Sequence, residues 1–235
     1  MGHYVADPPA KVLPLATCRT RVRVKMVRDG LFEVETKFYV PALAELRVRL
    51  LDSGATLSRR RVFEQNIRLD IDGGRLLHKG QMLRLRRDGR NVMTFKGPPP
   101  PGSQSEVKVR EELEISFDDY DTAVAILRRL GYEPVQTYEK YRETFSLDDI
   151  EIVLDELPFG NFVELEGREA TIKSTARRLE LDWDRRLNMN YLALMDLLVQ
   201  QYDLPCRDLT FGNFQDIPYT IGDIHDQILA DQRQN

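Results

Sequence analysis

The sequence has few of the residues that build disulfide frameworks and the commonest catalytic centres. It contains two cysteines, Cys18 and Cys206, far apart in the chain, and three histidines that form no cluster. This scarcity argues against a disulfide scaffold, a zinc site and a His- or Cys-based nucleophile, and it is typical of a reducing cytosol. A Gly-x-x-x-x-Gly-Lys loop, which would indicate a P-loop enzyme, is also absent.

Long apolar runs are missing as well. No segment is apolar for long enough to span a bilayer, and the N-terminus lacks the apolar core of a secretion signal. We therefore expect a cytoplasmic protein with no membrane partner. The 34 basic and 38 acidic residues nearly cancel, so the net charge of −4 indicates nothing about a polyanionic partner.

Strand-like segments dominate the part of the chain that follows residue 30. Most of them are joined by short turns such as Asp88-Gly89, which predicts a mainly antiparallel sheet. The expected strands are residues 31–40, 59–72, 82–87, 91–96, 105–117, 135–147, 150–156 and 162–166. Eight antiparallel strands can close into a barrel just wide enough for side chains or one small ligand.

Helical segments are expected between and after these strands, at residues 41–53, 118–130, 169–180 and 188–202. We divide the chain into an N-terminal arm (1–30) that includes a strand-like segment at 21–28, a barrel domain (31–202) and a C-terminal tail (203–235). In the tail, Ile221, Ile224, Ile228 and Leu229 are spaced to form one face of a short terminal helix.

Charged side chains occupy alternate positions on seven of the strand-like stretches. The first strand places Glu33, Glu35 and Lys37 on one face and apolar residues on the other. The pattern recurs at Arg84, Arg86, Lys96, Lys108, Arg110, Glu112, Glu114, Lys140, Arg142, Asp155, Glu164 and Glu166. For one strand alone a solvated outer face is the simpler explanation. The whole set argues against it, because closely spaced like charges repel on a bare strand.

The charges become reasonable if they face a lumen that holds a ligand. Mg²⁺ and Mn²⁺ take carboxylate oxygens, and Arg and Lys bind phosphate oxygens. Eight bases around one lumen match the several charges of a triphosphate better than a single phosphate. We therefore predict an α+β fold, an eight-stranded antiparallel β-barrel or tunnel with a polar, charged lumen that helices cover on the outside.

Seven ordered motifs resemble the CYTH superfamily, the triphosphate tunnel metalloenzymes. In chain order they are Glu33-x-Glu35-x-Lys37, Leu83-Arg84-Leu85-Arg86, Thr94-Phe95-Lys96-Gly97, Arg110-x-Glu112-x-Glu114, Lys140-x-Arg142, Leu154-Asp155 and Gly160-x-Phe162-x-Glu164-x-Glu166. The first motif alone is a weak pattern, but the set covers residues 31 to 200 on the predicted strands. A further lysine that some triphosphatases of the family carry on the following helix has no secure equivalent here.

The resemblance implies roles for these residues. Metal would be held by Glu33, Glu35, Glu164 and Glu166, with Asp155 and Glu114 as helpers. The phosphates would be bound by Lys37, Arg84, Arg86, Lys96, Arg110, Lys140 and Arg142. The first three motifs, with Glu33, Glu35, Lys37, Arg84, Arg86 and Lys96, would carry the catalytic work. Glu112 ranks lower, because it can instead pair with a neighbouring base.

Three functions remain open from the sequence. We favour a Mg²⁺- or Mn²⁺-dependent hydrolase of inorganic, thiamine or nucleoside triphosphate. A class IV-type adenylyl cyclase, which converts ATP to cyclic AMP and pyrophosphate, would use the same tunnel. A non-catalytic polyphosphate or nucleotide binder is a third reading, but its ligand would be repelled by the acids. We expect a small-molecule triphosphate as the partner rather than a nucleic acid, and the resemblance to the cyclases suggests a homodimer.

Overall fold

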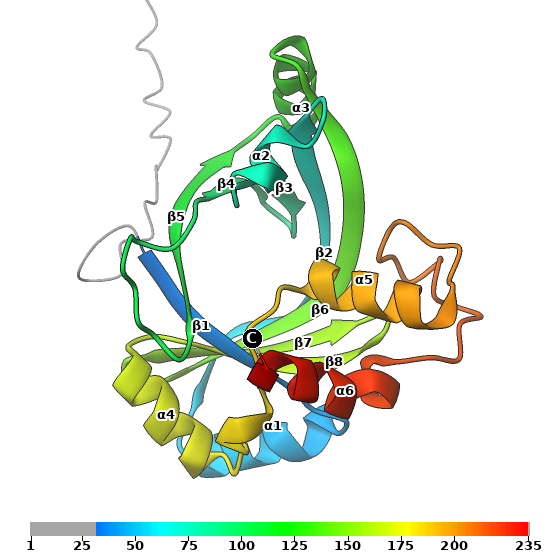
Figure 1. Ribbon diagram of the computed structural model, residues 1–235. Helices are drawn as coiled ribbons and strands as arrows, with labels where there is room; N and C mark the ends of the chain where they lie inside the picture. Colours follow the sequence, from blue (N-terminus) through cyan, green and yellow to red (C-terminus); the bar gives the residue numbers. More distant parts are fainter. Residues whose placement is uncertain (1–31, 235) are drawn as a thin grey trace, which may run out of the picture.

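A closed barrel forms the centre of the molecule (Figure 1). The computed structural model describes residues 32–234. Its strands follow the order β5-β4-β3-β2-β6-β7-β8-β1, and β1 pairs back with β5, so that eight strands close on themselves. Every pairing between these strands is antiparallel. The predicted eight-stranded antiparallel barrel is confirmed, with one short strand, β9, added beside β1.

The strands agree with the predicted ranges to within a few residues at most ends. They are β1 (Phe32–Tyr39), β2 (Thr56–Ile71), β3 (Met82–Arg87), β4 (Asn91–Lys96), β5 (Lys108–Phe117), β6 (Tyr132–Leu147), β7 (Ile150–Leu157), β8 (Gly160–Glu166) and β9 (Arg186–Leu187). β6 begins before Pro134, where the sequence predicts a boundary. The register with β2 shifts between Arg68 and Leu69, and this bulge accommodates a proline that cannot donate to the ladder.

Helices connect the strands and cover the outside of the barrel. They are α1 (Leu43–Asp52), α2 (Arg75–His78), α3 (Tyr120–Arg129), α4 (Glu169–Arg178), α5 (Tyr191–Tyr202) and α6 (Ile221–Gln234), with a 3₁₀ turn at Trp183–Arg185. Asp119 is the N-cap of α3, and its carboxylate accepts a hydrogen bond from the Thr122 amide at 3.0 Å. α2, a single turn after Gly74, is too short to give a periodic signal in the sequence.

The apolar core lies outside the barrel rather than within it. α1 and α4 pack on one side of the barrel and bury residues such as Leu46, Ile152 and Ile172. α3 covers the opposite side, over β2 and β3 (Figure 1). Where helices cover the outward faces of the strands, the apolar core forms outside the barrel and the inward faces are free to carry charge, as the sequence predicts. Leu113 and Ile115 on the outward face of β5 stay exposed.

The residues after α5 belong to the packed fold. Leu209 forms a parallel bridge with Tyr138 of β6, and Phe214 and Ile221 are buried against the same cluster. The helix expected in this region is α6. The N-terminal arm, including the strand-like segment at 21–28, lies outside the described residues. Within 32–234, no helix is both long enough and apolar enough to cross a membrane.

Candidate functional site

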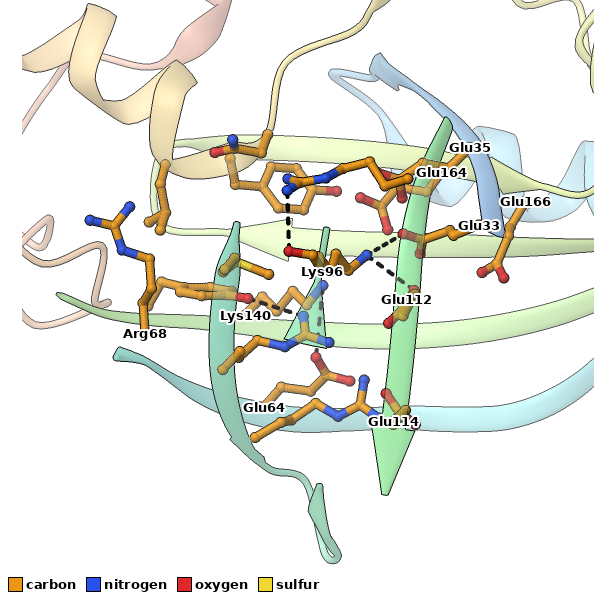
Figure 2. Close-up of a pocket in the computed structure, with 18 of the residues that line it drawn as sticks. Glu33, Glu35, Glu64, Arg68, Lys96, Glu112, Glu114, Lys140, Glu164 and Glu166 are labelled. Carbon is orange, nitrogen blue, oxygen red and sulfur yellow. Dashed lines mark hydrogen bonds and ion pairs between the residues drawn. The ribbon is translucent and has the colours of Figure 1, made fainter. Parts of the chain in front are cut away.

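The inward-facing charges surround a cavity of about 790 Å³ (Figure 2). All predicted site residues except Asp155 line it: Glu33, Glu35, Lys37, Arg84, Arg86, Lys96, Arg110, Glu114, Lys140, Arg142, Glu164 and Glu166, together with Glu112. Side chains from strands far apart in the sequence are thus brought to one lumen. The sequence period could predict the face of each strand, and closure of the barrel makes these faces a single site.

The acidic wall of the cavity comes from β1 and β8, and we define it as Glu33, Glu35, Lys37, Glu164 and Glu166. The register sets Lys37 opposite Glu164 and Glu35 opposite Glu166. The Lys37 ammonium, in a residue only 1% exposed, lies 3.5 Å from Glu164 and 3.8 Å from Glu35. Glu35 and Glu166 are like charges in a direct cross-strand pair, so this wall needs further positive charge.

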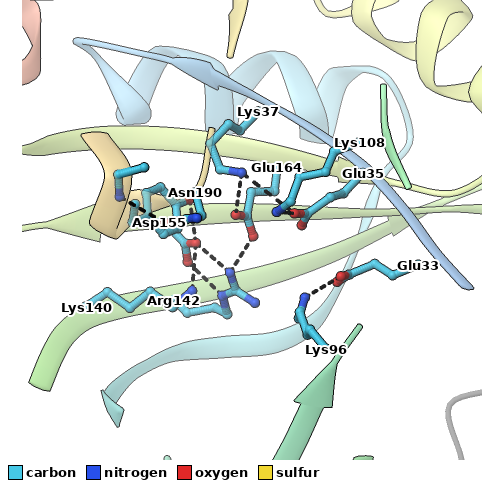
Figure 3. Close-up of polar contacts among 12 residues, drawn as sticks. Glu33, Glu35, Lys37, Lys96, Lys108, Lys140, Arg142, Asp155, Glu164 and Asn190 are labelled. Atoms are coloured by element: carbon cyan, nitrogen blue, oxygen red, sulfur yellow. Dashed lines mark hydrogen bonds and ion pairs between the residues drawn. The ribbon is translucent and has the colours of Figure 1, made fainter. Parts of the chain in front are cut away.

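Lysines of β4 and β5 supply positive charge to the same wall. Lys96 donates a hydrogen bond to Glu33, and Lys108 donates one to Glu35 (Figure 3). Burial, followed by the charge of Glu35, raises the pKa of Glu33 to about 8. Burial also opposes ionisation of Glu35, but the charges of Lys108 and Lys37 hold its pKa well below the usual range. Glu33 is therefore the less stable of these two anions.

The basic wall comes from β2, β3 and β6, and we define it as Arg84, Arg86, Lys140, Arg142 and Glu64 (Figure 2). β2 and β3 lie across the barrel from β1 and β8 (Figure 1). Arg84 donates to the Tyr138 hydroxyl at 3.1 Å and to the Thr94 hydroxyl at 3.0 Å. The guanidinium of Arg86 lies 3.5 Å from Glu114. Buried forked donors of this kind match phosphate oxygens.

Asp155 lies behind the basic wall. It is fully buried and does not line the cavity. Its carboxylate accepts hydrogen bonds from Lys140 at 3.0 Å, Arg142 at 2.7 Å and the Tyr191 hydroxyl at 2.9 Å (Figure 3). Burial opposes its ionisation, but Arg142 and Lys140 hold the pKa of Asp155 below its ordinary value. Arg142 also donates to Glu164 at 2.6 Å, which joins the two walls.

Arg110 is oriented differently from the other predicted phosphate ligands. Its guanidinium donates to backbone carbonyls of Gly97 at 2.8 Å, of Lys96 at 3.4 Å and of Gly80. Burial lowers its pKa. These bonds fasten the loops before β3 and after β4 to β5, and they engage the Nε and Nη2 of Arg110.

The two ends of the cavity have different chemistry. At the end where β2 finishes and β3 begins, the lining includes Leu77 of α2, Met82 and Leu192 of α5. At the other end, the lining includes Ser58 and Arg59 of β2, among other hydroxyl and charged side chains. A ligand with an apolar ring would therefore find apolar partners at the α2–α5 end.

The acidic wall has the donor atoms that a divalent cation requires, since Mg²⁺ and Mn²⁺ prefer carboxylate oxygens. Among residues 32–234, no three acidic, histidine or cysteine side chains converge as metal ligands do. Glu33, Glu35 and Glu164 instead face bases. Burial, followed by the charge of Glu35, raises the pKa of Glu33, and a cation beside this carboxylate would oppose both effects. The oxygen donors therefore fit a divalent cation, which would take the place of lysine contacts.

Three residues at the site are given no role by the sequence pattern. The alternating charges of its strand identify Lys108 as an inward-facing residue, but they do not predict its hydrogen bond to Glu35. Glu64 lies on β2, whose sequence mixes polar and apolar residues on both faces around this position. Tyr191 reaches Asp155 from α5, a contact that depends on how this helix docks.

Comparison with known proteins gives a consistent family and fold. Residues 31–190 match the CYTH domain. A 102-residue segment is 33% identical to a protein of Methanocaldococcus jannaschii named "putative adenylate cyclase" and covers 43% of this chain and 57% of that relative. The structure of a "putative adenylate cyclase" from Vibrio parahaemolyticus is 22% identical, with a TM-score of 0.64 over 71% of this chain and 99% of that one. A Hippeastrum protein described as a "putative adenylyl cyclase" with "a dominant" triphosphatase activity is 16% identical, with a TM-score of 0.51 over 70% and 95% of the two chains.

Proposed function

The chain belongs to the CYTH domain family, and from this premise we propose that it is a divalent-metal-dependent hydrolase of a triphosphate bound inside the barrel. The observation that carries the proposal is the pairing of the two walls around one cavity. A polyanion suits the basic wall, and a cation suits the acidic wall. A protein that only bound a polyanion would gain nothing from the acids, because they would repel its ligand.

In this proposal the basic wall binds the phosphate chain. Arg84, Arg86, Lys140 and Arg142 offer donors within one stretch of the lumen, and Lys96 and Lys37 extend them toward the acidic wall. Because Asp155 lies behind the wall and outside the cavity lining, its position supports a task other than metal binding. It holds Lys140 and Arg142 in place through its hydrogen bonds, so we propose it as a positioning residue.

The acidic wall would hold Mg²⁺ or Mn²⁺ through Glu33, Glu35, Glu164 and Glu166, with Glu114 close to the phosphate end. A bound divalent cation supplies charge neutralisation and lowers the pKa of a coordinated water. In hydrolysis, water attacks the terminal phosphorus, the bond to the bridging oxygen breaks, and orthophosphate and a diphosphate leave. The fixed bases of the lumen stabilise the charge that develops on the phosphoryl oxygens.

Adenylyl cyclisation is the second candidate, and the apolar end of the cavity is the observation that favours it. Leu77, Met82 and Leu192 offer a surface on which a nucleobase could lie, next to Arg84 and its neighbours. In that reaction, the ribose 3′-oxygen attacks the α-phosphorus and pyrophosphate leaves. Both reactions need the same two walls and differ in the phosphorus that faces the nucleophile.

Product analysis separates the candidates. The full-length protein is incubated with inorganic triphosphate, thiamine triphosphate or ATP, each with Mg²⁺, Mn²⁺ or a chelator, and the products are resolved by chromatography. We expect orthophosphate that depends on the metal. Cyclic AMP with pyrophosphate would establish the cyclase instead, and tight binding without turnover in either metal would leave only a binding protein.

A paired variant controls for contaminating phosphatases. Glu33→Gln combined with Glu35→Gln removes two carboxylates of the acidic wall at nearly constant volume, and turnover should fall by about 10²- to 10³-fold or more. Glu143→Gln, whose carboxylate pairs with Arg47 at 3.0 Å, is the matched control and should keep its activity. Unchanged turnover in the double variant would remove the metal assignment.

A further inference from the structure

A buried acid lies in the middle of the basic wall. Glu64 of β2 is 0% exposed and stands opposite Lys140 of β6 in the sheet register. Its Oε2 lies 3.7 Å from the Lys140 Nζ, within an ion pair but beyond hydrogen-bond distance (Figure 2). Neither of its carboxylate oxygens accepts a hydrogen bond from any residue that the structure describes. Buried carboxylates without such bonds are rare, because the lost hydration is costly.

Charge rather than hydrogen bonding keeps Glu64 in this position. Burial opposes its ionisation, yet the charges of Lys140 and Arg142, and then of Arg86 and Arg84, hold its pKa below the ordinary value. The contrast with Asp155 is direct, because that carboxylate accepts from three donors of the same region. Glu64 is therefore a carboxylate among bases, and none of these bases donates a hydrogen bond to it.

Other buried polar atoms in and beside this wall are also left without partners. The Arg84 Nε and both polar atoms of the Asn66 side chain have no hydrogen-bond partner among the described residues. Asn66 follows Glu64 on the same face of β2 and stands opposite Arg86. The side chains of this wall therefore do not complete one another's hydrogen bonds, and Glu64 is held beside its bases by charge alone.

We propose that Glu64 is a built-in counter-ion of the basic wall, a positioning residue that competes electrostatically with the phosphates of the substrate and so limits how tightly they are held. The inference rests on the proposed function in one respect, namely that phosphates bind to this wall. In the ligand-free tunnel Glu64 offsets part of the charge of four bases. When phosphates enter, it faces them as a like charge in a poorly screened interior.

This arrangement has a kinetic consequence. Binding that is equally tight for substrate and transition state lowers KM without raising kcat. Without Glu64, a polyanion product would leave more slowly from the four bases. A fixed acid that weakens both complexes alike favours release. The residue acts through the electrostatic field of the wall and is not required to touch the reacting atoms.

Metal-free binding tests the inference separately from catalysis. Inorganic triphosphate is titrated by calorimetry into the full-length protein in a chelator, for the wild type, Glu64→Gln and Glu143→Gln. The affinity of Glu64→Gln should increase on the order of tenfold, because a like charge near the ligand is removed. Glu143→Gln loses the same formal charge from a position paired with Arg47, so its affinity should stay within about twofold of the wild type. Equal or weaker binding by a folded Glu64→Gln variant overturns the inference.

Thermal unfolding establishes that the compared variants are folded. Loss of the acid leaves its bases less compensated, so ligand-free Glu64→Gln should melt below the wild type and gain more from added triphosphate. If this variant does not fold, Glu64→Asp replaces it. The shorter side chain withdraws the charge toward β2, and triphosphate should bind about twofold to threefold tighter than to the wild type. Unchanged or weaker binding by Glu64→Asp contradicts the proposal.

The outcomes distinguish this inference from the proposed function. If Glu64→Gln binds triphosphate more tightly without metal and the wild type shows no turnover, the counter-ion role of Glu64 is supported and the hydrolase proposal is rejected. If the wild type shows turnover and Glu64→Gln has an unchanged affinity for triphosphate, the hydrolase proposal is supported and the counter-ion role is rejected. A wild-type protein that binds no triphosphate at all would reject both.

Discussion

The acidic wall and the basic wall are built from the same kind of alternating strand, yet their buried charges are balanced in different ways. On the acidic wall, Lys37 lies between Glu35 and Glu164, and Glu33 and Glu35 accept hydrogen bonds from lysines of β4 and β5. On the basic wall, the embedded acid Glu64 accepts no hydrogen bond from the described residues.

Because of this difference, the two walls exchange different contacts when a ligand binds. A cation that enters the acidic wall must displace ammonium groups, so its binding is an exchange. A polyanion that enters the basic wall meets the guanidinium and ammonium groups that line the cavity. We therefore expect triphosphate to bind without metal, and metal to be needed for turnover rather than for binding. The predictions below test this division of work.

The largest effect is expected at Asp155, which fixes the basic wall and reaches the acidic wall through Arg142. Asp155→Asn leaves Lys140 and Arg142 buried with less compensation, and removal of one partner of a buried pair costs about 3–5 kcal/mol. The midpoint of thermal unfolding should fall by about 10 °C. Circular dichroism measures it, with Glu156→Gln as the control, because that carboxylate forms an exposed pair with Arg61. Equal melting of both variants would show that Asp155 does not fix the wall.

The division between the walls is tested next by Lys140→Met. Loss of a charge-assisted contact to phosphate should weaken metal-free binding of inorganic triphosphate by about tenfold to a hundredfold. The Glu33→Gln, Glu35→Gln double variant should bind the same ligand at least as tightly as the wild type while it loses turnover. Calorimetry in a chelator gives both affinities. If the double variant loses affinity as Lys140→Met does, the walls do not act separately.

The contrast between the walls also shows how far the sequence predicts the site. Alternation on β1, β3 and β8 predicts which side chains face the lumen, since a regular strand has a period of two. The identity of the ion pairs is not predictable in this way. Lys108 meets Glu35 because β1 pairs with β5, and these strands are separated by more than sixty residues of intervening chain.

Two residues show the physical limits more closely. Glu64 escapes prediction because the sequence of β2 has no clean alternation of polar and apolar residues: Val62 shares the face of Glu64, and Gln65 lies on the other face between Phe63 and Ile67. The alternation predicts that the Asp155 side chain points inward, but it does not predict that this side chain is buried away from the cavity. Its carboxylate is closed off by Tyr191 of α5, and the docking of that helix is decided by tertiary packing. The alternation of a strand predicts the face on which a side chain lies. Whether that side chain reaches the cavity depends on the side chains that cover it.

A smaller effect is expected at the apolar end of the cavity, where neither wall reaches. Leu77 of α2 is 57% exposed and lines this end. Leu77→Ser should lower kcat/KM for ATP or thiamine triphosphate by about threefold to fivefold, the value of partial burial of one leucine. Activity on inorganic triphosphate should not change. Leu51→Ser on α1, similarly exposed but away from the cavity, is the control. A uniform decrease with all substrates would mean that this end binds no organic group.

The smallest effect is expected where the basic wall ends, at Asp88 in the turn between β3 and β4. Its carboxylate accepts a hydrogen bond from Arg59 at 2.7 Å and lies 3.2 Å from the Arg86 Nε. Burial opposes ionisation, but the Arg59 bond and the Arg86 charge hold the pKa of Asp88 below its ordinary value. A lowered folded-state pKa stabilises the fold above the unfolded pKa of about 4, and this contribution is lost as the pH falls through the folded value.

Asp88→Asn should therefore melt about 2–4 °C below the wild type at pH 7, for a loss of about 1 kcal/mol. The difference should shrink as the pH is lowered from 5 toward 3, because the wild-type carboxylate then becomes protonated. Asp121→Asn serves as the control, since this exposed acid lies 3.4 Å from Arg87 on the surface and should show little difference at any pH. A difference for Asp88→Asn that persists unchanged at pH 3 would mean that the side chain stabilises the turn by shape, and that the acid at this end of the basic wall, unlike Glu64, is not there for its charge.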